Sequence, residues 1–138
     1  MEQYKDTAEK DWNNLIYQAL QTYPEKPWNW HSLSYNPNIT FQHVLENPDK
    51  PWDWHMLSSN TSITFEDVLQ NPDKPWDWNS LSYNTNITFE NVLQHPEKPW
   101  EWEELSCNGM KKGKEKFIDE RIWSAIHNDT SDIHTDNL

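Results

Sequence analysis

The sequence contains one cysteine and two glycines among its 138 residues. Cys107 has no partner for a disulfide within the chain, so disulfides cannot hold this fold together. Glycine normally makes the left-handed turn that ends a helix, and asparagine is its usual substitute. Because Gly109 and Gly113 both lie near the C-terminal end, turns elsewhere in the chain must be made by other residues.

Long apolar segments and basic residues are scarce as well. No run approaches the roughly 18 apolar residues that span a bilayer, and the opening MEQYKDTAEKDW lacks the apolar stretch of a signal peptide. The chain carries 23 acidic residues against 11 basic ones, a net charge of −12, whereas phosphate contacts need basic side chains. We therefore expect an intracellular protein that is not secreted, does not insert into membranes and is no general nucleic-acid binder.

Tryptophan, by contrast, is abundant. The mean hydropathy of −1.09 is typical of chains that do not fold, but ten tryptophans oppose that interpretation. A buried aromatic ring removes roughly 150–250 Å² from water, which stabilises the fold by about 4–6 kcal/mol as an upper bound. A few buried rings in each structural unit are therefore enough to hold a small polar unit together.

One phrase of the sequence is repeated at a fixed interval. NPDKPWDW occupies residues 47–54 and again residues 71–78, and looser copies begin at Tyr23 and His95. The Pro-Trp pairs recur with a period of 24 residues, at 27–28, 51–52, 75–76 and 99–100. A constant period in this range is typical of solenoid proteins, in which neighbouring units cover each other's apolar faces.

Each unit is predicted to contain two short helices. The first begins after an N-cap threonine and continues Phe-x-x-Val-Leu, with apolar residues at i, i+3 and i+4. The second is predicted to begin at the repeated proline, which is favoured in the first helical position, and to end in a left-handed asparagine. The residues concerned are Thr40, Thr64 and Thr88, then Pro27, Pro51, Pro75 and Pro99, and finally Asn36, Asn60, Asn84 and Asn108.

The two ends of the chain depart from the repeat. Trp12, Leu15, Ile16, Ala19 and Leu20 predict one amphipathic helix, and Ile118, Ile122, Ala125 and Ile126 predict another. The predicted organisation is an N-terminal capping helix in 1–22, tandem repeats in 23–106, a C-terminal capping helix in 107–127 and a polar tail in 128–138. The fold class is therefore all-α, a short α-solenoid of about four 24-residue helix-pair repeats with capping helices at both ends.

The phrase LSYNPNITFQHVLENPDKPWDW resembles a tandem repeat found in proteins of large DNA viruses that infect amoebae. The resemblance covers residues 23–106 and depends on the Pro-Trp-x-Trp and Asn-x-x-Ile-Thr elements. The 24-residue spacing is also similar to that of leucine-rich-variant repeats, whose units pair an α-helix with a 3₁₀ helix. These resemblances imply a solenoid, a viral or virus-associated origin, a location in the host cytoplasm or virion, and no enzyme activity; the second helix is left as α or 3₁₀.

Two sets of recurrent residues are candidate binding sites. Two tryptophans separated by one residue point about 200° apart on a helix, so they cannot share a face. Trp30, Trp54, Trp78 and Trp102 are expected to face the core, whereas Trp28, Trp52, Trp76 and Trp100 either pack between repeats or form an exposed column for a glycan or peptide. The carboxylates of Asp53, Asp77 and Glu101 either complement helix N-termini or form an acidic strip for a basic partner.

Other chemistry is less well supported by the sequence. His31 and His55 occupy equivalent positions, but a metal site needs three or four convergent ligands. There is no glycine-rich phosphate loop and no Gly-x-Ser-x-Gly motif, so no catalytic residue, metal or cofactor is predicted. The leading hypothesis is a non-enzymatic protein–protein interaction scaffold; the alternatives are a glycan- or peptide-binding module and a self-associating structural subunit.

Overall fold

The computed structural model describes residues 1–131, and every regular element in this part of the chain is an α-helix. Two helices of 21 residues, α1 (Glu2–Thr22) and α9 (Lys111–Ser131), flank seven helices of six residues each. The short helices are α2 (Trp30–Tyr35), α3 (Phe41–Glu46), α4 (Trp54–Ser59), α5 (Phe65–Gln70), α6 (Trp78–Tyr83), α7 (Phe89–Gln94) and α8 (Trp102–Cys107).

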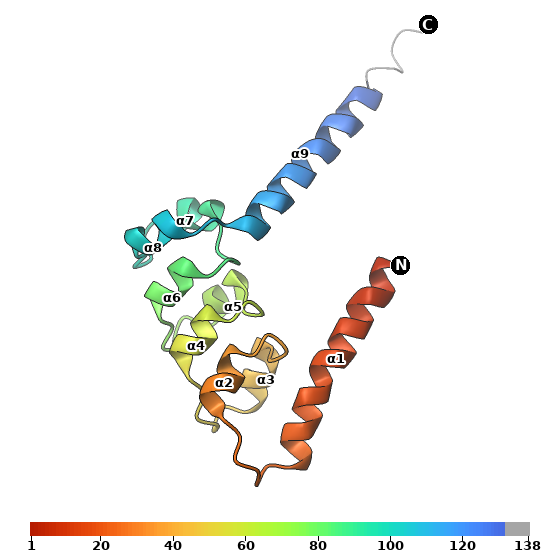
Figure 1. The fold of residues 1–138 in the computed structure, drawn as a ribbon. Helices are drawn as coiled ribbons and strands as arrows, with labels where there is room; N and C mark the ends of the chain where they lie inside the picture. The colour runs from red at the N-terminus through yellow and green to blue at the C-terminus, as the bar shows by residue number, and fades with distance from the viewer. Residues whose placement is uncertain (132–138) are drawn as a thin grey trace, which may run out of the picture.

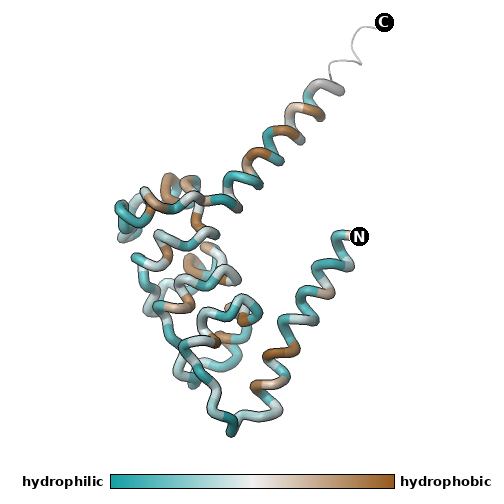
Figure 2. Tube along the Cα trace, in the orientation of Figure 1, coloured by the Kyte–Doolittle hydropathy of each residue, from teal (hydrophilic) through white to brown (hydrophobic). Residues whose placement is uncertain are grey.

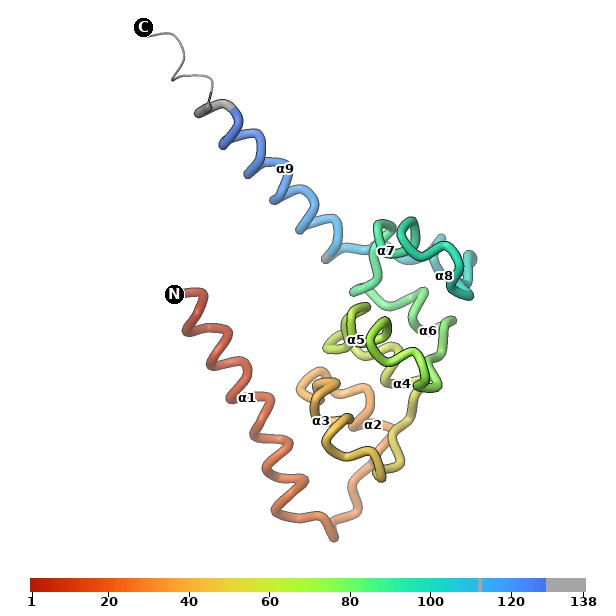
Figure 3. Tube along the Cα trace, turned by 180° about the vertical axis from the view of Figure 1, so that it is seen from behind, coloured from red at the N-terminus to blue at the C-terminus, as the bar shows by residue number. Residues whose placement is uncertain are grey.

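The short helices form two rows, as Figures 1 and 3 show from opposite sides. Helices α2, α4, α6 and α8, here called the even row, pack side by side. Helices α3, α5 and α7 form the second row, and the two long helices project from the ends of the stack (Figure 1). The all-α solenoid prediction is confirmed, and the second helix of each unit is α rather than 3₁₀.

Threonine begins the first helix of each unit, as predicted. The Oγ1 atoms of Thr40, Thr64 and Thr88 accept hydrogen bonds from the amide three residues on, at 3.4, 3.2 and 3.1 Å. The side chains of the residues at that third position, His43, Asp67 and Asn91, accept from the threonine amide in return. These reciprocal capping boxes satisfy two amides that a helix start leaves free.

The second helix does not begin at proline, so that prediction was wrong for Pro27, Pro51, Pro75 and Pro99. The segment before it makes two successive turns instead, with Lys50 N donating to Asn47 O at 3.2 Å and Trp52 N donating to Lys50 O at 2.8 Å. The helix starts three residues later, after Asn29, Asp53, Asp77 or Glu101 in the N-cap position. Tying the first tryptophan into a turn therefore moves it out of the helix.

The asparagines that end these helices are not left-handed, which corrects a second prediction. Asn36, Asn60, Asn84 and Asn108 have φ angles of −68°, −71°, −65° and −75°, in the extended region. Among the described residues the one positive φ outside glycine is at Met110, at 46°. The asparagines recur because the side chains of Asn60, Asn84 and Asn108 contact the preceding repeat.

The core lies between successive repeats. Ile39, Ile63 and Ile87 are at most 1% exposed, and Leu57 and Leu81 are equally buried. The second tryptophans are only partly buried in Trp30, Trp54 and Trp78, and Trp102 is 65% exposed, so the prediction that all four face the core fails at the C-terminal end. Figure 2 shows hydrophobic segments both in the stack and along the two terminal helices.

The terminal helices are present as predicted but make few contacts with the stack. Ile16 and Leu20 of α1 pack against the core, although no residue of α1 is fully buried. Met110 is buried beside α9, but the predicted apolar residues Ile118, Ile122 and Ile126 remain exposed. Helix α9 also runs to Ser131, so the polar tail does not begin at residue 128; residues 132–138 of that tail lie outside the described part.

Candidate functional site

The first tryptophan of each inner unit lies between two repeats. Trp52, Trp76 and Trp100 are at most 9% exposed, which contradicts an exposed column at these positions. The second tryptophan of the preceding unit meets each ring edge-on, with Trp54 and Trp76 centroids 5.1 Å apart at 88°. Phe41 contacts Trp76 from the other row at 5.4 Å. Such perpendicular pairs add to the energy of area burial, so these rings hold the repeats together.

Each first tryptophan is also held by its indole N–H. The Nε1 atom of Trp76 donates to the carbonyl of Asn71 at 2.8 Å, and the same bond recurs five residues back from Trp28, Trp52 and Trp100. A buried indole needs such a partner because an unpaired N–H in the interior is costly. The Asn-Pro-x-x-Pro-Trp phrase is therefore a closed turn that places one ring in the gap between repeats.

A ladder of asparagine side chains runs along the even row. Asn84 Nδ2 donates to Ser58 O at 2.9 Å and to Asn60 O at 3.2 Å, both in the preceding repeat. Its Oδ1 accepts from Asn86 N at 2.9 Å, so one amide side chain makes three bonds. Asn60 and Asn108 make the equivalent contacts. The ladder joins the C-terminal ends of neighbouring helices and is buried.

The recurrent serine joins the C-terminal end of one helix of the even row to the N-cap of the next. Ser58 Oγ donates to Trp54 O at 2.7 Å and accepts from Asp77 N, the N-cap of the next helix, at 3.0 Å. Ser34 and Ser82 do the same, and all three are fully buried. These serines are structural links, in agreement with their appearance in every unit.

The candidate carboxylates of the acidic strip are engaged within the fold. Asp53 Oδ1 accepts from Met56 N at 3.1 Å, and its Oδ2 lies 2.7 Å from His31 Nδ1 of the preceding unit. The hydrogen bond from His31, together with that from Met56 N, lowers the pKa of Asp53. Asp53 therefore caps its own helix and bridges to the previous one.

Asp77 repeats this arrangement one unit further along. His55 Nδ1 contacts Asp77 Oδ2, and Ser80 Oγ donates to the same oxygen at 2.9 Å. Burial raises the pKa of Asp77, but the hydrogen bonds from His55, Ser80 and Asn79 N outweigh it, so the pKa is lowered. Glu101 occupies the third such position and makes no capping bond through its side chain.

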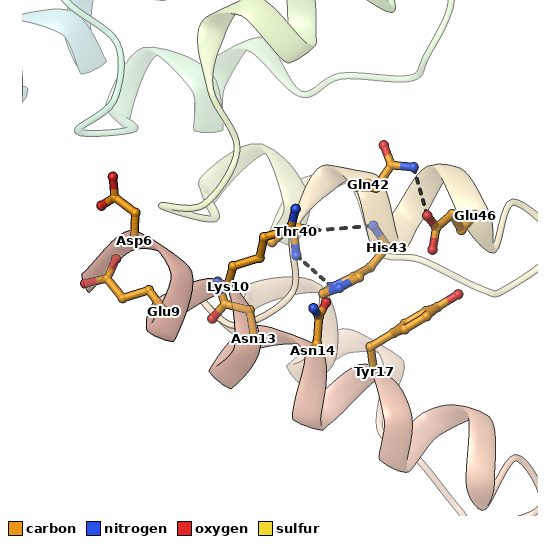
Figure 4. A pocket seen from close by; sticks show the side chains of 10 residues that line it. All are labelled: Asp6, Glu9, Lys10, Asn13, Asn14, Tyr17, Thr40, Gln42, His43 and Glu46. Atoms are coloured by element: carbon orange, nitrogen blue, oxygen red, sulfur yellow. Dashed lines mark hydrogen bonds between the residues drawn. The ribbon is translucent and has the colours of Figure 1, made fainter. Parts of the chain in front are cut away.

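A groove of about 480 Å³ lies between α1 and α3, drawn in Figure 4. Tyr17 stacks on the His43 ring with centroids 4.7 Å apart, and Gln42 donates to Glu46 at 2.9 Å. His43 Nδ1 is occupied as the acceptor of Thr40 N at 3.1 Å, so that nitrogen is not free to act as a base. The groove thus lies where α1 joins the stack.

Metal-binding chemistry does not assemble in the described part either. Among residues 1–131 no group of three or more His, Cys, Asp and Glu side chains is placed to hold a metal ion. The His31 and His55 rings each pair with a carboxylate instead. Within the same range no helix is long and apolar enough to cross a membrane.

The C-terminal end of the stack is left open. Phe89 is 58% exposed, because no further tryptophan reaches it in the way that Trp76 reaches Phe41. Ser106 Oγ donates to Trp102 O, and within residues 1–131 no amide donates to it in return. The sequence predicted a self-associating subunit as one alternative, but which groups are left open at this end depends on the contacts between repeats.

Sequence reasoning placed the candidate residues in the right units but missed their pairing. The contact between Trp54 and Trp76 joins different repeats and has no local signature. The constancy of Ser and Asn in every unit was a usable signal, because surface positions vary between repeats whereas these do not. No family model, curated protein or solved structure matches this chain.

Proposed function

We propose that this chain is a non-enzymatic protein-interaction module whose α9 helix binds a partner protein. The observation that supports the proposal is the exposure of large apolar side chains on a helix that projects from the stack (Figure 1). These are Phe117, Ile118, Ile122, Trp123 and Ile126, all between 43% and 62% exposed. Ile118, Ile122 and Ile126 are four residues apart and share one face of the helix, and exposed apolar surface of this kind is typical of a protein-binding site.

The length of α9 strengthens this interpretation. Most helical stability in proteins comes from packing of an apolar face, and an isolated helix is marginal in water. Beyond Gly113, which lies against Thr88, the side chains of α9 from Lys114 to Asn128 are exposed. A partner that covers Ile118 and Ile122 supplies the burial that the stack does not.

The alternatives are less well supported. A glycan- or peptide-binding tryptophan column needs accessible rings, and Trp52, Trp76 and Trp100 are buried. An acidic strip needs free carboxylates, and Asp53 and Asp77 already pair with histidines. The resemblance of residues 23–106 to the viral repeat supports a partner in the host cytoplasm or the virion.

The test is affinity capture of the tagged full chain from virus-infected amoebae, with the double variant Ile118→Gln/Ile122→Gln beside the wild type. Burying two isoleucines stabilises a complex by about 3–5 kcal/mol, so the variant is expected to lose the partner almost completely. Glu120→Gln, on the opposite face of α9, is the matched control and should retain the partner. Equal recovery by the double variant and the wild type would rule out α9 as the binding surface.

A further inference from the structure

We propose that copies of this chain stack head to tail, so that α2 of one copy continues the even row beyond α8 of another. The proposal goes beyond the protein-binding function of α9, because it concerns a different surface and a different partner. It follows from the contacts that join repeats within the chain. Each internal junction of the even row uses the same hydrogen-bond donors, acceptors and tryptophan rings. At the α8 end the acceptors of this junction are unused, and at the α2 end the donors are unused.

The α8 end offers acceptors that no described group fills. Inside the row, Ser34 Oγ accepts from Asp53 N at 2.9 Å, and Ser34 O accepts from Asn60 Nδ2 at 2.9 Å. Ser106 is the equivalent serine at the α8 end, and neither its Oγ nor its carbonyl receives such a bond within residues 1–131. The Trp102 ring, 65% exposed, lacks the edge contact that each inner tryptophan receives.

The α2 end offers the matching donors. Asn36 is the first member of the asparagine ladder, and its Oδ1 accepts from Asn38 N at 2.9 Å. Its Nδ2 has no acceptor in the described part, unlike the Nδ2 of Asn60 one unit on. The backbone amide of Asn29 is likewise unbonded, and the Trp28 ring is half-buried with no aromatic ring against it. Donors at one end thus correspond one for one to acceptors at the other.

The side chains at positions 29 and 103 are also compatible with this junction. At internal junctions His31 pairs with Asp53 and His55 pairs with Asp77. Stacking would bring residue 29 of one copy against residue 103 of the other in the same geometry. Residue 103 is Glu, the one acid at its position in the repeat, and residue 29 is Asn, the one uncharged N-cap.

The amide of Asn29 fits this junction in detail. Asn29 Oδ1 caps its own helix by accepting from Ser32 N at 3.0 Å, as Asp53 Oδ1 caps Met56 N at 3.1 Å. The Nδ2 of Asn29 is then free to donate to the Glu103 carboxylate of the other copy. An aspartate at position 29, as at 53 and 77, would place two carboxylates together and repel.

The repeat register gives the remaining contacts. Trp28 of the arriving copy would enter the space between Trp102 and Phe89, as Trp76 lies between Trp54 and Phe41. Tyr17 of that copy would reach the position now held by Gly113, where an added Cβ would collide with the Thr88 side chain. Stacking therefore requires the first turn of α9 to move away from Thr88. Since the two surfaces differ, the contact does not close on itself and copies can extend into filaments.

The test is sedimentation of the full-length protein over a range of concentrations, with variants at the two ends. The wild type is expected to grow beyond its 16.7 kDa monomer as concentration rises. Asn29→Asp keeps a capping side chain but faces Glu103 with like charge, so association should weaken about tenfold or more. Adding Glu103→His rebuilds the His–Asp pair of the internal junctions, so Asn29→Asp/Glu103→His should recover wild-type association.

Asn29 is the N-cap of α2 and Glu103 lies in α8, and these helices are at opposite ends of the even row (Figure 1). Rescue of one substitution by the other therefore reports contact between molecules. A wild type that stays monomeric at every concentration overturns the proposal. Association that Asn29→Asp leaves unchanged also overturns it, and its loss in Ile118→Gln/Ile122→Gln would assign self-association to α9. Capture of a different partner through α9 would stand in either case, so the two proposals fail separately.

Discussion

Asparagine at the end of each second helix serves as a structural link between repeats. The Asn84 side chain makes three hydrogen bonds in a position that is 4% exposed. Glycine or a left-handed residue would end the helix equally well, but neither carries an amide that reaches the previous repeat. The requirement for Asn thus comes from the neighbour and not from the turn in which it lies.

Replacing Asn84 by alanine should therefore destabilise the stack. Two carbonyls and one amide lose their partner at a buried site, which costs about 2–4 kcal/mol. Asn36→Ala is the matched control: it removes the equivalent residue at the open α2 end, where Nδ2 has no acceptor in the described chain, and should cost about 1 kcal/mol or less. Urea unfolding followed by tryptophan fluorescence measures both, and equal losses would contradict the ladder.

The predicted helix starts include one set that is confirmed, at threonine, and one that is wrong, at proline. Thr40, Thr64 and Thr88 were predicted as N-caps because threonine before an apolar i, i+3, i+4 pattern is a local signal, and local hydrogen bonds decide the outcome. Proline was wrongly placed in the first helical turn because that prediction ignored the tryptophan after it. The Trp52 ring is fixed by its contact with Trp30 of the preceding unit, and its N–H by the carbonyl of Asn47 five residues back, so the helix begins only at Trp54.

For the two long helices as well, the sequence predicts the helix but not what it contacts. The periodicity of residues 11–20 and 117–126 predicts helices, and both exist. Whether an apolar face is covered depends on what lies opposite, and the described side chains of α9 from Lys114 to Asn128 remain exposed. The sequence therefore predicts the elements and the repeat, whereas the pairing of Trp54 with Trp76 and the open ends follow only from the assembled stack.

The capping box of α3 should make the first repeat sensitive to acid. His43 Nδ1 accepts from Thr40 N, which requires an unprotonated nitrogen, and burial lowers the pKa of His43 below its usual 6.5 although Glu46 opposes the shift. Because the pKa is lowered in the folded state, the stability that the neutral His43 ring contributes is fully present above pH 6.5. It is lost as pH falls towards the folded-state pKa.

His43→Asn tests this because Asn91 makes the same box in α7, accepting from Thr88 N at 2.9 Å. Between pH 7 and 5 the stability of the variant should fall less steeply than that of the wild type, by at most about 1.4 kcal/mol per pH unit. Unfolding curves at several pH values give the change in the free energy of unfolding per pH unit for each protein. Parallel slopes would mean that His43 takes up its proton over the same pH range in the folded and unfolded chains, which would contradict the lowered pKa. The loss of its stacking on Tyr17 lowers the whole curve without changing its slope.

At the scale of the whole molecule, stability should vary along the stack. In a solenoid each repeat contacts only its neighbours, so local stability depends on how many sides are covered. Helices α4 and α6 have a neighbour in the even row on both sides, whereas α2 and α8 have one. Helices α1 and α9 depend on a few contacts near one end of each.

Hydrogen exchange should follow this order, with the slowest amides in α4 and α6, faster exchange in α2 and α8, and the fastest in α9. The comparison also separates the two outer surfaces, because head-to-tail stacking covers α2 and α8 but leaves α9 uncovered. Raising the protein concentration should therefore slow exchange in α2 and α8 of the wild type and not in Asn29→Asp. Uniform exchange through all nine helices of residues 1–131 would show instead that the stack opens as one cooperative unit. In that case the loss of a single link such as Asn84 would destabilise every repeat equally.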